Sequence, residues 1–219
     1  MNCKYKVVMF DLDGTISDSA KGVRECIELA MEELGKKAPN LDDVSKYVGP
    51  PLLTTFETLC GLGKEEGLKG VELHRKYYEK YGIKQNTMYS GIDKVINNVI
   101  ESGAKVCIAS SKYDGFIHEV LDIIGLDAKF DMIVGSTIEG YRKEKEEVLE
   151  YILDSFKDEY KKEEFVLIGD TTFDAKGANY VGCDFIAVTY GCGKEEEIKA
   201  MGVEKLCKTA DEINKYLFY

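Results

Sequence analysis

The sequence lacks the features that would place a protein in a membrane or on a nucleic acid. None of its apolar runs approaches the roughly 20 residues that a membrane-spanning helix requires. Positive charge is also in short supply, because 29 lysines and arginines stand against 40 aspartates and glutamates, for a formal net charge of −11. Phosphate backbones and anionic lipid surfaces repel an acidic chain of this kind. We therefore expect no nucleic-acid partner and no membrane partner.

Histidine and paired cysteines are scarce as well. The chain has only two histidines, and its seven cysteines are scattered without a CxxC pair. A zinc site of thiolates and imidazoles needs such spacing. The first apolar run starts at Val7, which leaves no room for a signal peptide. The sequence thus predicts reduced thiols and a cytoplasmic protein.

Short apolar runs alternate with helical patterns over most of the chain. The predicted strands are 7–10, 104–109, 130–134, 165–168 and 184–188. The predicted helices around them are 92–102, 116–124, 144–156, 174–181 and 210–217. Strands that alternate with helices in this way predict an α/β fold, in which a parallel sheet is covered by helices on both faces.

The second strand comes late in this pattern. Between the first strand and Ala104, the region from Ser17 to Gln85 contains only helical patterns, including a helix that we expect Ser17 or Asp18 to cap. This region therefore reads as an insertion. We predict a core of residues 1–16 and 86–219, and an all-helical cap domain of residues 17–85.

Polar side chains follow three of the predicted strands. The residues at these ends are Asp11 and Asp13, then Ser110 and Ser111, then Asp170 with Asp174 one helical turn further on. Because ligands bind beyond the carboxyl ends of parallel strands, we expect these groups to converge on one crevice. Asp11 and Asp13 lie two residues apart, so they are expected to point the same way. Oxygen ligands without histidine or thiol favour Mg²⁺.

This constellation suits phosphoryl transfer. A Mg²⁺ ion held by a few carboxylates keeps positions open for phosphate oxygens, and a carboxylate can act as a covalent nucleophile. Transfer also needs a neutralised phosphoryl group and a proton for the leaving group. The pattern predicts that Asp11 attacks, that Asp13 carries the proton, and that Mg²⁺ and a lysine neutralise charge.

Three motifs in order resemble the haloacid dehalogenase (HAD) superfamily, in its phosphatase branch. Residues 11–15, Asp-Leu-Asp-Gly-Thr after a hydrophobic strand, resemble its motif I; Ser110 resembles motif II; and Gly169-Asp170 with Asp174 resembles motif IV. The helical insertion is similar to a C1 cap. Residues 48–52 and 188–191 resemble the phosphoglycolate-phosphatase-like subgroup. The resemblance implies a Rossmann-like core with this cap.

The resemblance also implies roles for the motif I residues. Asp11 would be the nucleophile, forming an aspartyl-phosphate, and would also bind Mg²⁺. Asp13 would be the general acid and base, and would bind Mg²⁺ through its backbone carbonyl. Gly14 and Thr15 would shape the turn at the phosphate.

The later motifs supply the remaining groups. The resemblance implies that Ser110 and the Ser111 amide hold the phosphoryl oxygens. It makes Asp170 a direct metal ligand, with Asp174 as a carboxylate behind it.

The motif III lysine has two candidates, Lys143 and Lys145. Related sequences place this lysine directly before an acidic or polar pair and two aliphatic residues, which favours Lys145. It would bridge Asp11 and the phosphate. Lys112 is a further cation near the rim.

These residues predict a Mg²⁺-dependent phosphomonoester hydrolase for a small phosphorylated metabolite. Phosphoglycolate, a nucleoside monophosphate and a small sugar phosphate are the candidate substrates. The alternatives are a phosphosugar mutase of the β-phosphoglucomutase type and a non-catalytic binding protein with the same fold. The two histidines, His74 and His118, are assigned to structure or surface.

Overall fold

A parallel six-stranded sheet lies at the centre of the computed structural model, which describes residues 2–219. The strand order is β5-β4-β1-β6-β7-β8, and every neighbouring pair is parallel. The strands are β1 (Val7–Phe10), β4 (Lys105–Tyr113), β5 (Met132–Ser136), β6 (Phe165–Gly169), β7 (Asp184–Val188) and β8 (Leu206–Cys207). The predicted α/β fold class is confirmed.

Strand β1 lies in the middle because its residues are apolar on both faces. Val8 and Phe10 pack into one hydrophobic cluster, whereas Val7 and Met9 pack into the other. The chain continues to β4 on one side of β1 and reaches β6 on the other. The strand order therefore reverses at β1, and this is the position where an open α/β sheet forms its binding crevice.

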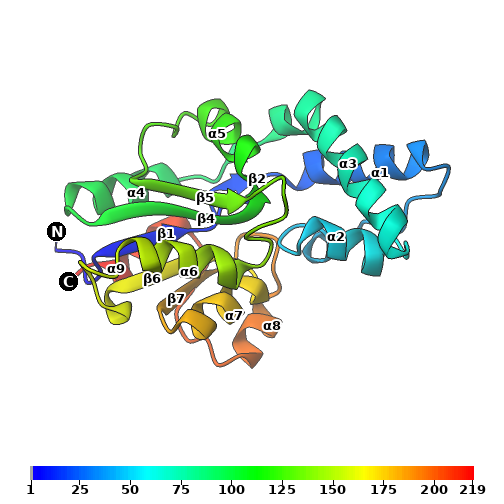
Figure 1. The fold of residues 1–219 in the computed structure, drawn as a ribbon. Helices are drawn as coiled ribbons and strands as arrows, with labels where there is room; N and C mark the ends of the chain where they lie inside the picture. The colour runs from blue at the N-terminus through cyan, green and yellow to red at the C-terminus, as the bar shows by residue number, and fades with distance from the viewer. Residues whose placement is uncertain (1) are drawn as a thin grey trace.

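Helices cover both faces of the sheet (Figure 1). Helices α4 (Ile92–Glu101), α5 (Asp114–Ile123) and α9 (Asn214–Leu217) bury side chains in the cluster that contains Phe10. Helices α6 (Lys145–Ser155) and α7 (Thr172–Val181) bury theirs in the cluster that contains Met9. The remaining elements of the core are α8 (Glu195–Ala200) and the 3-10 turns η4 (Lys162–Glu164) and η5 (Ala210–Ile213). Within residues 2–219, no helix combines the length and the hydropathy needed to cross a bilayer.

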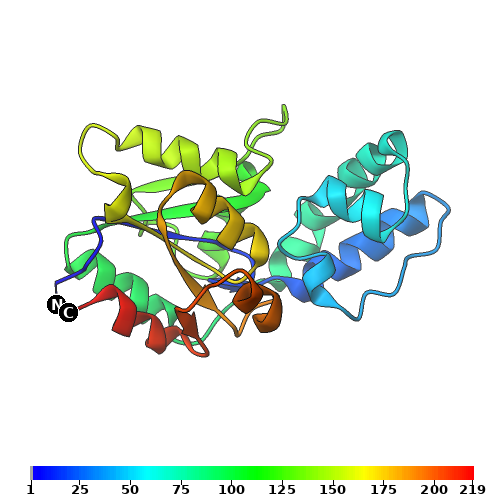
Figure 2. The ribbon, with the colours of Figure 1, turned by 90° about the horizontal axis from the view of Figure 1, so that it is seen from below.

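A group of helices lies beyond the carboxyl ends of the strands (Figures 1 and 2). It consists of α1 (Ala20–Glu33), η1 (Val44–Lys46), α2 (Leu52–Thr54), the π-helical η2 (Thr55–Leu59), α3 (Lys64–Lys80) and η3 (Gly82–Gln85). The chain enters this group through β2 (Ser17–Asp18) and leaves it through β3 (Thr87–Met88), and these two short strands pair with each other. The predicted division into a core and a cap domain of residues 17–85 stays a prediction.

One local prediction holds in part and another was wrong. Ser17 and Asp18 form strand β2, and the Ser17 hydroxyl donates a hydrogen bond to Asn86 Oδ1 at 2.9 Å, but the Asp18 carboxylate accepts one from the Ala20 amide at the start of α1 at 3.1 Å. A strand of two residues is too short to leave a pattern in the sequence. Strand β4 also continues past Ala109 to Tyr113, with a shift of register between these two residues. Ser110 and Ser111 therefore lie within the strand and not after it.

A matched pair of helical isoleucines tests the packing of the core. Ile152 of α6 is fully buried in the cluster around Met9, whereas Ile123 of α5 is 42% exposed. We expect Ile152→Ala to lower the free energy of unfolding by about 2–5 kcal/mol, because it opens a cavity in a packed core. Ile123→Ala should cost less than about 1 kcal/mol. Urea unfolding of the two variants measures both values, and equal losses would contradict the packing described.

Candidate active site

Three carboxylates meet at the switch point of the sheet. Asp11 directly follows β1, Asp170 directly follows β6, and Asp174 lies in the first turn of α7. All three are buried, and each offers an oxygen within 4.8 Å of the other two. The structure thus brings together three of the four residues expected at a metal.

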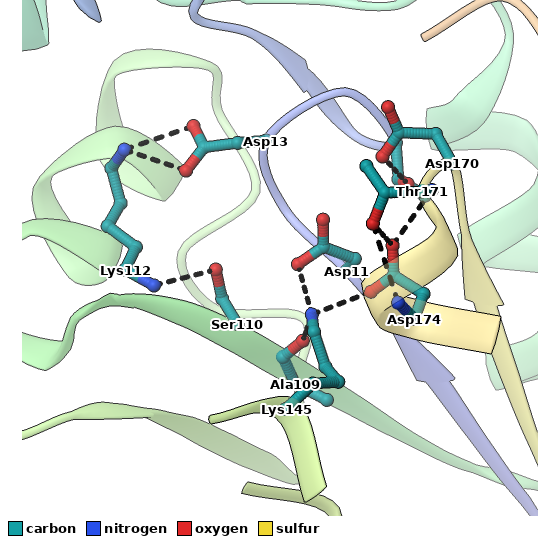
Figure 3. Close-up of polar contacts among 10 residues, drawn as sticks. Asp11, Asp13, Ala109, Ser110, Lys112, Lys145, Asp170, Thr171 and Asp174 are labelled. Carbon is teal, nitrogen blue, oxygen red and sulfur yellow. Dashed lines mark hydrogen bonds and ion pairs between the residues drawn. The ribbon is translucent and has the colours of Figure 1, made fainter. Parts of the chain in front are cut away.

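Lys145 joins this cluster at the start of α6 (Figure 3). Its Nζ lies 2.7 Å from Asp11 Oδ1 and 2.8 Å from Asp174 Oδ1, and it donates a hydrogen bond to the Ala109 carbonyl at 2.7 Å. Burial alone would lower the pKa of Lys145, but Asp11 and Asp174 raise it above its ordinary value. Lys145 is therefore a charged, buried partner of Asp11. Lys143 is exposed, and its side chain forms no ion pair within residues 2–219.

Glycines allow the chain to close around Asp170. A Cβ at Gly14 would lie 2.2 Å from Asp170 Oδ2, and the φ of Gly14 is +91°, which disfavours any side chain. A Cβ at Gly191 would lie 2.4 Å from the same oxygen, and one at Gly193 would lie 1.8 Å from the Asp170 carbonyl. These three positions accept only glycine because the backbone touches Asp170 directly.

Neutral donors hold the Asp170 carboxylate. The amides of Cys192 and Gly193 donate to Oδ2 at 2.7 and 3.2 Å, and the Thr15 hydroxyl donates to Oδ1 at 3.3 Å. These two amides could not be predicted from the sequence, because every residue except proline has a backbone amide. The only sequence feature at this position is the pair of glycines on either side of Cys192. Thr15, expected only to shape the turn, contacts Asp170 itself.

Asp174 is held in the same way by one neighbouring residue. Its Oδ2 accepts hydrogen bonds from the Thr171 amide at 3.0 Å and from the Thr171 hydroxyl at 2.7 Å. These contacts form a capping box at the start of α7. The helix start therefore fixes the direction of Asp174, whose Oδ1 reaches Lys145.

The cluster carries more negative than positive charge. Among the described residues, Lys145 is the only cation paired with any of the three carboxylates, and it contacts Asp11 and Asp174 only. Burial, and then the neighbouring Asp174 and Asp11, raise the pKa of Asp170 well above its ordinary value. Burial likewise raises the pKa of Asp11, which Lys145 offsets only in part. A divalent cation would balance this charge, and an all-oxygen donor set fits Mg²⁺.

Asp13 stands outside the cluster of three carboxylates, although it lines the same cavity as Asp11. Both residues lie in the loop after β1, which ends at Phe10. That their side chains point the same way stays a prediction. The Asp13 carboxylate turns toward Lys112, whose Nζ lies 2.8 and 3.0 Å from its two oxygens (Figure 3). The same Nζ lies 4.4 Å from the ring centre of Tyr78 on α3.

A cavity of about 390 Å³ opens between this site and the helices beyond it. Asp11, Asp13, Ser110, Ser111 and Lys145 line its floor. Ser110 is buried, and its Oγ accepts a hydrogen bond from the Lys112 amide at 3.2 Å. The site therefore offers carboxylates, hydroxyls and lysines around one enclosed volume, as a phosphate ester requires.

Comparison with known proteins identifies the family. The model of the haloacid dehalogenase-like hydrolase family matches residues 8–188. A 5'-nucleotidase of Pseudomonas aeruginosa is 32% identical over 90% of this chain and 88% of its own length. A phosphoglycolate phosphatase of Aquifex aeolicus is 29% identical over 85% of each chain. The crystal structure of a predicted phosphatase from Clostridium acetobutylicum matches 97% of each chain with a TM-score of 0.91 and 32% identity.

The chain therefore belongs to the haloacid dehalogenase-like hydrolase family. Its relatives and structural neighbours within that family include phosphatases. The resemblance seen in its three motifs is confirmed.

The contacts of Lys145 and Lys143 predict different outcomes for the same substitution. Lys145→Met should lower kcat for p-nitrophenyl phosphate by about a hundredfold to a thousandfold, because the cation beside Asp11 is lost. Lys143→Met should change kcat by less than about threefold, because an exposed and unpaired cation contributes little. Steady-state kinetics with circular dichroism as a folding control measures this. A larger loss in the Lys143 variant would contradict the assignment.

Gly14 and Gly35 form a second matched pair. Both have positive φ, but a Cβ at Gly35 would meet nothing within 4 Å, whereas one at Gly14 would strike Asp170. We expect Gly14→Ala to raise the Mg²⁺ concentration needed for half-maximal activity by at least about tenfold, as disturbed metal ligands do. Gly35→Ala should leave that concentration unchanged while lowering the thermal midpoint. An equal metal requirement in both variants would show that the contact with Asp170 is unimportant.

Proposed function

We propose that the chain is a Mg²⁺-dependent phosphomonoester hydrolase that works through an aspartyl-phosphate on a small phosphorylated metabolite. The observation that carries this proposal is the buried Asp11 carboxylate, which faces the cavity and has Lys145 as its ion-pair partner. The named activities of the relatives, phosphoglycolate phosphatase and 5'-nucleotidase, support a small phosphomonoester. We also propose that the protein acts in the cytoplasm.

Asp11 begins the reaction. One of its carboxylate oxygens forms a bond to phosphorus while the bond from phosphorus to the leaving oxygen breaks. Lys145 favours the ionised, nucleophilic form of Asp11 against the effect of burial. Ser110 and the Ser111 amide line the same floor, where they hold the phosphoryl oxygens in place.

Asp13 acts as the general acid and then as the general base. It must first leave its ion pair with Lys112 and take up a proton as the substrate binds; it then gives this proton to the leaving oxygen, and in the second step it takes one from the water that attacks the aspartyl-phosphate. Lys112 holds the two oxygens of Asp13 apart from the Asp11 cluster, so the nucleophile and the proton carrier have separate partners. Paired carboxylates that divide acid–base work need such different surroundings.

The residues suited to hold Mg²⁺ are Asp11, Asp170 and the backbone carbonyl of Asp13, with Asp174 behind them. When bound there, the ion would neutralise charge on the carboxylates and on the phosphoryl oxygens. The glycine contacts around Asp170 fix this carboxylate before any ion arrives.

An Asp11→Asn variant tests the mechanism. Phosphate release from p-nitrophenyl phosphate should fall by at least about a thousandfold, because an amide cannot form the acyl-phosphate. Asp122→Asn, at an exposed position on α5, serves as the matched control and should keep full activity. Removing Mg²⁺ with EDTA should abolish turnover in the wild type, and adding Mg²⁺ should restore it. Activity that survives either treatment would overturn the proposal.

The mutase alternative requires its own measurement. A mutase would convert β-glucose 1-phosphate to glucose 6-phosphate without releasing phosphate. We expect free phosphate and no glucose 6-phosphate. Formation of the isomer would replace the hydrolase proposal by the mutase one.

A further inference from the structure

Two side chains of α3, His74 and Arg75, line the wall of the cavity opposite the catalytic floor. Neither takes part in the chemistry proposed above. His74 is only 6% exposed, and its ring nitrogens make no hydrogen bond of good geometry among the described residues, although the Val23 backbone lies close enough to affect the pKa of the imidazole. A buried polar group without a partner costs free energy, so it calls for an explanation.

His74 is poised to bind a neutral group. Burial, and then the nearby charge of Lys112, lower its pKa to about 3, so the imidazole is neutral at physiological pH. A neutral imidazole carries one N–H donor and one acceptor nitrogen. From the sequence, His74 is expected to have a structural or surface role. In the structure, it borders the cavity.

Arg75 is an unpaired cation in an acidic protein. Its guanidinium lies 5.2 Å from the ring centre of Tyr113, and its side chain forms no hydrogen bond or ion pair within residues 2–219. The two lysines on the floor differ in this respect, because Lys112 and Lys145 are each matched to carboxylates. Arg75 therefore keeps its hydrogen-bond donors free beside the cavity.

The same wall is aromatic and aliphatic. Tyr113 and Phe116 pack edge to face with ring centres 5.1 Å apart, and both border the cavity. Leu52, Leu53 and Val71 are among the other apolar residues that line the cavity. Such surfaces bind the faces of planar rings by stacking.

The cavity is larger than phosphoglycolate, the smallest candidate substrate, would need. Cavities that enclose a ligand of many atoms measure about 300–1,000 Å³, and this one falls in that range at about 390 Å³. A two-carbon leaving group is much smaller than this volume. A sugar could pack its C–H face on an aromatic ring, so a sugar phosphate has to be compared directly with the nucleotides.

Resting on the proposed phosphomonoester hydrolysis, we propose that His74 and Arg75 form a leaving-group subsite for a planar heterocycle, so that the substrate class is nucleoside monophosphates. The phosphate lies at Asp11 and the base reaches α3. Arg75 and His74 donate to and accept from the polar edge of the base, and the apolar wall covers its faces.

A substrate panel with matched variants tests this assignment. The panel compares kcat/KM for nucleoside 5'-monophosphates, phosphoglycolate, glucose 6-phosphate and acetyl phosphate, whose leaving group is too short to reach α3. We expect at least one nucleotide to be the preferred metabolite. Arg75→Ala should lower kcat/KM for that nucleotide by about tenfold to a hundredfold, mainly through KM, as the loss of a charged hydrogen bond does. His74→Phe should lower it by about threefold to tenfold.

The controls separate this proposal from the hydrolase proposal. Both variants should lose much less activity on acetyl phosphate than on the nucleotide, so that the ratio of the two kcat/KM values falls, whereas Arg24→Ala, at an exposed arginine of α1, should change no substrate. Preference for phosphoglycolate or the sugar phosphate, or a nucleotide activity indifferent to Arg75→Ala and His74→Phe, would overturn the subsite while leaving the hydrolase intact. A wild type without activity on acetyl phosphate or p-nitrophenyl phosphate would instead overturn the hydrolase itself.

Discussion

The structure depends on an imbalance of charge at one edge of its sheet. Asp11, Asp170 and Asp174 lie buried together, and Lys145 forms ion pairs with Asp11 and Asp174 but not with Asp170. Such an arrangement is costly in a folded protein unless further positive charge arrives. The glycines at positions 14, 191 and 193, and the amides after Gly191, serve to keep Asp170 in this unfavourable place. The free energy of the fold, supplied by the two hydrophobic clusters, thus sustains a local excess of negative charge.

A second ion pair lies on the other side of the same crevice. Lys112 holds Asp13, and its ammonium group also lies over the ring of Tyr78 on α3. The Tyr78 hydroxyl accepts a hydrogen bond from Asn86 Nδ2 at 2.8 Å, and Asn86 in turn accepts one from Ser17. The contacts around Asp13 therefore extend from β4 through the helical insertion to its two connecting strands, whereas those around Asp11 stay within the core.

The sequence predicted the core of the site well because the chemistry follows strand ends. Asp11, Asp170 and Asp174 could be placed together from topology alone, and Lys145 was preferred to Lys143 because an acidic pair and two aliphatic residues follow it, as in related sequences. The pairing of Asp13 with Lys112 was not predicted, because residues 99 positions apart leave no joint pattern in a sequence. The backbone donors to Asp170 were missed because amides carry no residue identity.

The insertion was harder to predict for a different reason. Its helices are visible in the sequence, but β2 and β3 have two residues each and no periodicity. His74 and Arg75 have no motif, because their importance comes from the cavity that α3 faces. The role of a residue that faces a cavity depends on the residues on the opposite wall, and these are distant in the sequence. Such a role cannot be predicted from the residues next to it in the chain.

The pairing of β2 with β3 has a consequence for how such enzymes diversify. Ser17 lies opposite Met88, and Asp18 opposite Thr87, so the chain leaves the core and returns at adjacent strands, which are about 4.8 Å apart. Because the entropy of closing a loop grows only slowly with its length, segments of very different size can join these two points. Replacing the helical segment between β2 and β3 by another segment would change the residues that face the cavity from the helices. The carboxylates at the ends of β1 and β6 would stay the same.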